Sequence, residues 1–240
     1  MSSRVDTKSP MQEAWATVVS LAASPVAAGG AVVPVFYGFM AKSAQQLGNP
    51  VPSMPPVEVL KAGVKAAPTI ALIVGMQTAA QSGLEKAWLN GQAASPFSML
   101  LSAAAVGAVS AHGLAMFNAQ SMGQSPLQAA KDLSFKQGSA IVTRETSFLL
   151  ALRIAGPVSE AMQRQFGKNK AVDYASAFTT GVIGSVVGHP ADAALTLWQK
   201  GMPVTSISQL MRGAPARALA VGGFSVCYKT LKECIEATAK

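Results

Sequence analysis

Charged residues that interrupt apolar stretches are the side chains in this sequence best suited to chemistry. Arg144 and Glu145 are adjacent in one such stretch; Asp192 lies in a second. Arg217 lies in a third. A charge in apolar surroundings is costly unless it pairs with an opposite charge or faces a polar cavity. These residues could therefore bind an ionic solute or join helices by ion pairs. No nucleophile–base pair, metal-ligand set or phosphate loop accompanies them, so we do not expect an enzyme.

The composition favours a membrane protein. Half of the 240 residues are hydrophobic and only 12% are charged, whereas a soluble domain carries about 25% charged residues. The net charge is +8, but the basic residues are scattered singly, which argues against nucleic-acid binding. The first fifteen residues mix acidic and basic side chains and resemble neither a signal peptide nor a transit peptide. Import into an organelle would then depend on internal signals.

Apolar runs predict the helices that must position the charged residues. A bilayer is crossed by about 20 mainly apolar residues. Four charge-free runs contain such spans, at about 14–41, 66–84, 97–119 and 174–191. Two further segments, 138–162 and 213–232, contain charges, which in a membrane bundle face the interior. The sequence therefore predicts an all-α fold of six transmembrane helices.

A repeat organises these helices into three pairs. A basic residue precedes a glycine at the start of each even helix, in Lys61-Ala-Gly63, Lys136-Gln-Gly138 and Arg212-Gly213. Successive glycines are 75 positions apart (138 − 63 = 75 and 213 − 138 = 75). Gln120 and Gln199 end two of the odd helices. Because a fixed period indicates repeated structural units, we predict three repeats, at 1–90, 91–168 and 169–240.

Three tandem helix pairs with these residues resemble the mitochondrial carrier family. The third repeat carries most of the resemblance, in Pro190-Ala-Asp192, Gln199, Arg212-Gly213, Arg217 and Tyr228. In the second repeat, Arg144-Glu145-Thr146-Ser147-Phe148 resembles the fourth-helix segment of the family. The resemblance implies pseudo-threefold symmetry, with kinked odd helices that meet at the base of a central cavity. Gly184 and Gly188 form a GxxxG pattern, which lets neighbouring helices approach closely.

The family also closes its cavity with rings of interhelix ion pairs, and most residues of those rings are missing here. Aligned on Gln120, the second repeat has Ala111, Gly113 and Met116 where proline, acid and base are expected. The first repeat offers Pro34, Phe36 and Phe39, and the third has Leu195 in the basic position. Pro190, Asp192, Gln199 and Gln120 are thus interpreted as remnants of a gate. Asp192 has no basic partner at the family positions, which leaves Lys200 or water.

By resemblance, Arg144, Glu145 and Arg217 are candidate substrate contacts, as in members that carry amino acids. Two alternatives stay open: Arg144 and Glu145 can neutralise each other, and Arg217 can extend to the lipid headgroups. We expect His112 and His189 to be packing residues near the kinks. We expect Cys227 and Cys234, seven positions apart, to share a helix face without forming a disulfide.

The basic residue and glycine that open two even helices, Lys136 with Gly138 and Arg212 with Gly213, resemble the cardiolipin sites of the family. Free amides at a helix start favour a phosphate, so bound cardiolipin is the one non-protein component that we expect. Other partners follow from two hypotheses. The degraded gates and short connections suggest a transport-incompetent structural subunit of a larger mitochondrial inner-membrane complex, such as a respiratory complex or ATP synthase. The alternative is a divergent carrier that exchanges a small amino acid or carboxylate.

Overall fold

The computed structural model describes residues 10–88 and 96–238, and these residues form helices and connections without any strand. The helices are α1 (Pro10–Gln46), α2 (Pro56–Trp88), α3 (Pro96–Val109), α4 (Ala111–Ser121), α5 (Pro126–Lys131), α6 (Phe135–Arg153), α7 (Ala155–Phe166), α8 (Lys170–Val187), α9 (His189–Gln199), α10 (Ile207–Leu210) and α11 (Ala214–Ala237). The predicted all-α class is confirmed. Each predicted span falls on a long helix or on two helices in succession.

Two helices of the described part are long and apolar enough to cross a membrane. The segments are Leu21–Gln46 of α1 and Pro56–Leu84 of α2. The α3–α4 pair adds a third if its two helices, bent by 62°, count as one span. These helices are compatible with a membrane protein. The number of six spans stays a prediction.

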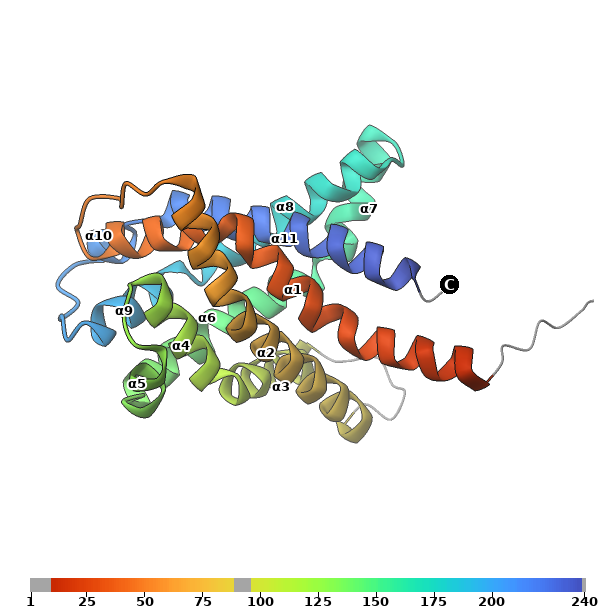
Figure 1. Ribbon diagram of the computed structural model, residues 1–240, viewed down its shortest axis with the longest axis horizontal. Helices are drawn as coiled ribbons and strands as arrows, with labels where there is room; N and C mark the ends of the chain where they lie inside the picture. The colour runs from red at the N-terminus through yellow and green to blue at the C-terminus, as the bar shows by residue number, and fades with distance from the viewer. Residues whose placement is uncertain (1–9, 89–95, 239–240) are drawn as a thin grey trace, which may run out of the picture.

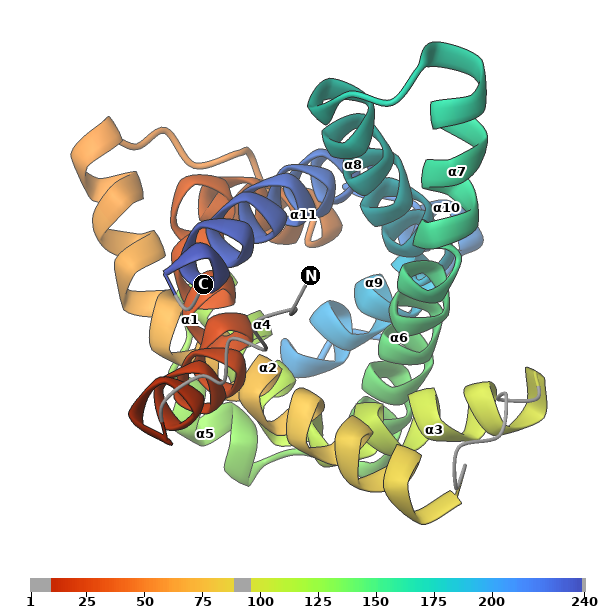
Figure 2. The same cartoon turned by 90° about the vertical axis from the view of Figure 1, so that its right-hand side faces the viewer.

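The long helices form a closed ring. Neighbours in contact run from α1 to α2, then to the α3–α4 pair, α6, the α8–α9 pair and α11, which packs against α1 again. Figure 2 shows this ring along the long axis of the molecule. In Figure 1, α5, α9 and α10 lie at one end of this axis and the C-terminus lies at the other. We call these the connection end and the terminal end. The long axis of the ring thus joins these two ends.

Two of the odd-numbered spans break at matching places. α3 gives way to α4 at Ser110, and α8 gives way to α9 at Gly188, 78 positions later (188 − 110 = 78). The Ser110 hydroxyl donates to the carbonyls of Val106 and Gly107, and such bonding back onto the preceding turn bends helices. At the second break Pro190 lies in the first turn of α9, where its missing N–H costs nothing. The helix is therefore interrupted next to Pro190, where the sequence predicts a kink.

Glycines allow the helices of the ring to approach closely. A Cβ at Gly63 would overlap the backbone of Val33 in α1. One at Gly184 would lie 2.7 Å from Cβ of Ala151, and one at Gly188 would lie 3.0 Å from the Arg144 carbonyl. The GxxxG pair thus packs α8 against α6, as predicted. Close packing through small residues is how membrane helices associate when no hydrophobic effect drives them together.

Several charged and polar side chains are buried inside the ring, while large apolar side chains are exposed on its outside. Lys42, Asn118 and Asp192 are each only 2% exposed, whereas Leu21 and Leu219 are 70% and 66% exposed. A soluble protein rarely exposes large continuous apolar surfaces. In a membrane protein, by contrast, ionisable residues face the bundle interior. This distribution agrees with the apolar helices in favouring a lipid environment.

Replacing Gly63 with alanine should destabilise the α1–α2 contact. The new methyl group has no space beside Val33, and such overpacking costs about 1–3 kcal/mol, more than the higher helix propensity of alanine returns. The matched control is Gly138→Ala in α6, where a Cβ would meet nothing within 4 Å. Thermal unfolding of the solubilised protein should show a lower Tm for Gly63→Ala only. Equal Tm values would show that α1 and α2 do not approach in this way.

Candidate functional site

A cavity of about 110 Å³, part of it open to solvent, lies at the centre of the ring. Side chains from α1, α2, α4, α6, α9 and α11 line it. Its charged members are Lys42, Arg144, Glu145, Asp192 and Arg217. The three candidate substrate contacts of the sequence analysis are thus brought together, and the structure adds two residues to them. We call these five residues the charge cluster.

Asp192 is the centre of the charge cluster. Its Oδ2 accepts hydrogen bonds from Lys42 Nζ and Gln46 Nε2, both at 2.9 Å. Its Oδ1 accepts from Arg144 Nη1 at 3.0 Å, and Arg217 Nε lies 3.7 Å from Oδ2. The partners come from α1, α6 and α11, so one carboxylate joins four helices. Hydrogen bonds to an ionised carboxylate are stronger than those between neutral groups, and the donors Lys42 and Arg144 are charged as well.

The lysine that pairs with Asp192 is a residue that the sequence analysis missed. The expected partner Lys200 is exposed at the end of α9, and Lys42 takes its place. A signal was present: Lys42 stands four residues before Gln46 at the end of the first apolar run, the spacing of base and glutamine in the family pattern. The alignment on Pro34 hid it, because Pro34 places Phe39 in the basic position.

Arg144 and Glu145 form the predicted ion pair, and each of them also bonds a further side chain. Arg144 Nε donates to Glu145 Oε1 at 3.0 Å, and the other carboxylate oxygen accepts from Gln77 Nε2 at 3.2 Å. Arg144 therefore joins Glu145 to Asp192. Arg144 and Glu145 thus neutralise each other and line the cavity, which is the alternative to substrate contact that the sequence left open. Their contact with a substrate stays a prediction.

Arg217 lies inside the ring and not at the headgroup level. It is 5% exposed, and its Nη1 donates to the carbonyl of Ser185 in α8. Its ion pair with Asp192 is longer than a hydrogen bond. The interpretation of Arg217 as an arginine that extends to the lipid headgroups is therefore wrong, because the side chain points to the cavity.

A hydrogen-bond network of mainly uncharged side chains lies at the connection end of the charge cluster. Asn118 in α4 accepts from Lys42 Nζ at 3.0 Å and donates to Gln199 in α9 at 2.7 Å. The hydroxyls of Ser43 in α1 and Ser121 in α4 are 2.7 Å apart. These contacts join the last turns of α1, α4 and α9. We call this layer the cavity floor.

Aromatic contacts reinforce the floor. The ring of Phe117 in α4 packs edge-on against Phe36 and Phe39 of α1, with centroids 5.8 and 5.2 Å apart. The 78-residue offset between the two helix breaks relates Phe117 to Leu195. Apolar side chains thus occupy the position of the family's base in the second and third repeats, whereas Lys42 has the spacing of that base in the first. The 78-residue offset replaces the alignment of the second repeat on Gln120. The side-chain oxygen Oε1 of Gln120 is buried and makes no hydrogen bond.

The lipid candidates lie in different surroundings. Lys136 is exposed, and its Nζ lies 4.5 Å from the ring centroid of Trp198 in a groove between α6 and α9. Gly138 lines a separate groove beside α4. Arg212 is exposed, but Gly213 is buried, and a Cβ there would lie 2.8 Å from the Lys42 carbonyl. Gly213 therefore serves packing, and the two residue pairs are not equivalent sites.

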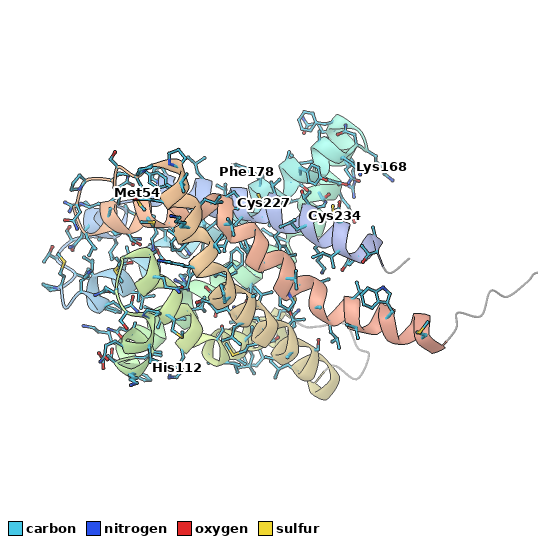
Figure 3. All side chains as sticks on the ribbon, viewed as in Figure 1. Met54, His112, Lys168, Phe178, Cys227 and Cys234 are labelled. Atoms are coloured by element: carbon cyan, nitrogen blue, oxygen red, sulfur yellow. The ribbon has the colours of Figure 1, made fainter. Side chains whose placement is uncertain are left out.

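The remaining candidates are structural. His189 is buried, and its Nε2 bonds with the Arg212 carbonyl at 3.0 Å, as expected for a packing residue at a kink. His112 is exposed on the outside of the molecule (Figure 3). Cys227 and Cys234 are free thiols on α11 (Figure 3). Among residues 10–88 and 96–238 no group of acidic, histidine and cysteine side chains is placed to hold a metal ion.

No family model, curated protein or solved structure matches this chain. The site is consequently interpreted from its own geometry and from the residues that resemble the mitochondrial carriers.

Replacing Asp192 with asparagine should destabilise the ring strongly. The change keeps the shape of the side chain but leaves Lys42, Arg144 and Arg217 buried around a neutral amide. Breaking a buried pair by removing one partner costs about 3–5 kcal/mol. The control is Glu160→Gln, because Glu160 is exposed and pairs only with Arg164 one turn away. Thermal unfolding should show a large loss for Asp192→Asn and almost none for the control. Similar curves for the two variants would contradict the role of Asp192.

Proposed function

We propose that this chain is a six-span protein with the mitochondrial carrier fold, located in the mitochondrial inner membrane, that has lost transport. Its role is then structural, as a subunit of a larger complex such as a respiratory complex or ATP synthase. The observation that carries the proposal is the cavity floor, where aromatic packing and amide hydrogen bonds accompany the ion pair between Lys42 and Asp192 that joins α1 to α9.

The nature of these contacts supports a fixed structure. A gate that opens exchanges its ion pairs for water or for another set of pairs. The packing of Phe117 against Phe36 and Phe39 cannot be exchanged for contacts with water in this way, because opening would expose three aromatic rings. The hydrogen bonds of Asn118 and Gln199 would also have to break in the same step. The floor is thus better suited to holding α1, α4 and α9 together than to alternating access.

The ion pair at the terminal end of the ring also argues against alternating access. At the terminal end, the ion pair between described residues that joins separate helices is Lys229 in α11 with Asp173 in α8, at 3.9 Å and about one third exposed. Exposed pairs of this kind contribute about 0–1 kcal/mol. One weak pair does not close a ring of six helices, so the described residues 10–88 and 96–238 hold no ring of ion pairs like the second gate of the family.

The charges of the cavity also favour a structural role. Arg144 and Glu145 already bond each other, and Asp192 bonds Lys42 and Arg144. A solute would have to displace these partners, each buried and well aligned. The outer surface of the ring, in contrast, is apolar and available to lipid or to other membrane helices. Neighbouring subunits and cardiolipin, through the Lys136–Trp198 groove, are the partners that fit this surface.

Native gel electrophoresis of mildly solubilised membranes tests the proposal. We expect the tagged chain to migrate with a complex several times its own 24.6 kDa. Asp192→Asn should reduce the amount in that complex, because a loosened ring presents a different outer surface, while Glu160→Gln should assemble normally. Recovery of the wild-type chain only as a free monomer that is stabilised by a solute would contradict the proposal.

A divergent carrier is the second candidate, and the central cavity with Arg144 and Arg217 is the observation that favours it. This candidate predicts uptake of a small amino acid or carboxylate into liposomes that contain the purified chain. Arg144→Ala and Arg217→Ala would abolish uptake, and Arg164→Ala on the exposed side of α7 would not. On the structural proposal we expect no uptake above empty liposomes for any of these proteins.

A further inference from the structure

One part of the outer surface of the ring is polar. The outer faces of α2 and α11 expose large apolar side chains such as Leu72 and Leu219. The first turns of α6 instead expose Ser139 and Thr143, and the neighbouring helix α4 exposes His112. An open groove between α4 and α6 is lined by all three of these polar side chains. We call it the α4–α6 groove.

The polar side chains of this groove lie deeper than the lipid headgroups if the ring spans a membrane. Lys136, whose Nζ lies 4.5 Å from the ring centroid of Trp198, marks the headgroup level, because basic and aromatic side chains gather at the membrane interface. Thr143 stands two helical turns later, which is about 10 Å along the axis of α6. His112 lines the groove beside Thr143. The groove therefore reaches into the hydrocarbon region, which is about 30 Å thick.

The groove has unused capacity for hydrogen bonds. The hydroxyls of Ser139 and Thr143 donate to the carbonyls of Phe135 and Ser139, both at 2.9 Å, so their protons are used within α6. The lone pairs of the two oxygens can still accept hydrogen bonds. His112 makes no hydrogen bond with residues 10–88 or 96–238, and a neutral imidazole has one donor and one acceptor nitrogen. Lipid chains satisfy none of these groups.

Gly138 shows that the groove has room for another helix. It stands 75 positions from Gly63 and from Gly213. A Cβ at Gly63 would meet the backbone of α1, and so would a Cβ at Gly213. A Cβ at Gly138 would meet nothing within 4 Å, and this glycine lines the α4–α6 groove. Two of the three glycines thus pack against a helix of this chain, while the third faces unoccupied space.

We propose that a transmembrane helix of a neighbouring subunit lies in the α4–α6 groove and places an asparagine or glutamine beside Thr143 and His112. An amide group donates to the hydroxyl oxygens and accepts from the imidazole N–H, so one side chain satisfies both kinds of group. Hydrogen bonds of this type join helices within membranes. The proposal rests on the structural role proposed above, and it adds the surface and the chemistry of the partner.

A second copy of this chain fits the groove less well than a different subunit. A twofold axis along the membrane normal would bring the same patch of both copies together. Lys136 would then face its own counterpart, and like charges are unfavourable across an interface. The hydroxyl oxygens would also meet further acceptors. A lipid such as cardiolipin could pair with Lys136, but its acyl chains would leave Thr143 and His112 without hydrogen bonds.

Enlarging Ser139 tests the position of the partner. Ser139→Leu fills the groove, and we expect it to lower the fraction of the chain that migrates with the complex on a native gel about tenfold. The Tm of the solubilised chain should not change, because Ser139 is exposed. The matched control is Val64→Leu, at the exposed position of α2 that stands 75 residues earlier (139 − 64 = 75). This control should assemble as the wild type does.

A second pair of variants tests the hydrogen bond. Thr143→Val keeps the shape of the side chain but removes its hydroxyl, and should lower the fraction in the complex about threefold. Thr143→Ser retains the hydroxyl and should assemble almost as the wild type does. Equal assembly of the two variants would contradict a polar contact at Thr143.

The outcomes separate this inference from the structural role. Normal assembly of Ser139→Leu, or equal loss in Val64→Leu, would overturn the inference and leave the structural role standing. A wild-type chain found only as a free monomer would contradict both. Loss of bound cardiolipin from Ser139→Leu without loss of assembly would overturn the inference by assigning the groove to a lipid. Co-precipitation of two differently tagged copies that Ser139→Leu abolishes would overturn it in favour of a second copy.

Discussion

A carboxylate that is 2% exposed at the centre of a helical ring is the constraint on which this structure depends. Asp192 tolerates burial only because donors from α1, α6 and α11 converge on it. Removing the carboxylate from water costs several kcal/mol even in a relaxed protein, and good geometry with further hydrogen bonds must offset this. The positions of four helices are consequently coupled to one side chain. The convergence of α1, α4 and α9 on the cavity floor follows from the same network, through Lys42 and Asn118.

A lipid environment, with which the apolar helices of the ring are compatible, would give buried polar groups a large part in specifying its centre. Lipid is as apolar as leucine, so apolar packing alone gives membrane helices little preference for one arrangement. Polar groups in the interior do give such a preference, because each one that loses its partner is left unsatisfied without water. Glycines at crossing points then allow the helices close enough for these short side-chain bonds to form. Gly188 against the Arg144 carbonyl shows both effects at one place.

Helices and kinks could be predicted from sequence because their causes are local. The apolar runs predicted the long helices, and Pro190 predicted the break before α9. The pair of Arg144 and Glu145 could be predicted because the two residues are adjacent in the sequence. The break at Ser110 has no proline, and it depends on a serine hydroxyl that bonds to the preceding turn, which is a weak signal in sequence. The sequence also did not show that Gly138 and Gly213 have different roles. Both follow a basic residue at the same period, yet only one is packed against another helix.

Partners in the charge cluster were harder to predict, because ion pairs between distant helices depend on register. The alignment of the first repeat on Pro34 was shifted by three residues, so that it placed Phe39 instead of Lys42 in the basic position. Asp192 was then left without a predicted partner. A buried acid with no base is physically costly, and the sequence contained that warning. Requiring a donor for Asp192 among all basic residues near helix ends would have returned Lys42 as a candidate.

Cross-linking Ser43 to Ser121 tests the convergence of the helix ends most directly. In a chain with Cys227→Ser and Cys234→Ser, the pair Ser43→Cys and Ser121→Cys should form an intrachain disulfide almost completely under mild oxidation, since the two hydroxyls are 2.7 Å apart. A control pair, Ser43→Cys with Ser139→Cys on the exposed side of α6, should remain reduced. Cross-linking of the first pair that is no greater than that of the control would contradict a closed floor, and with it the ring that surrounds the cavity.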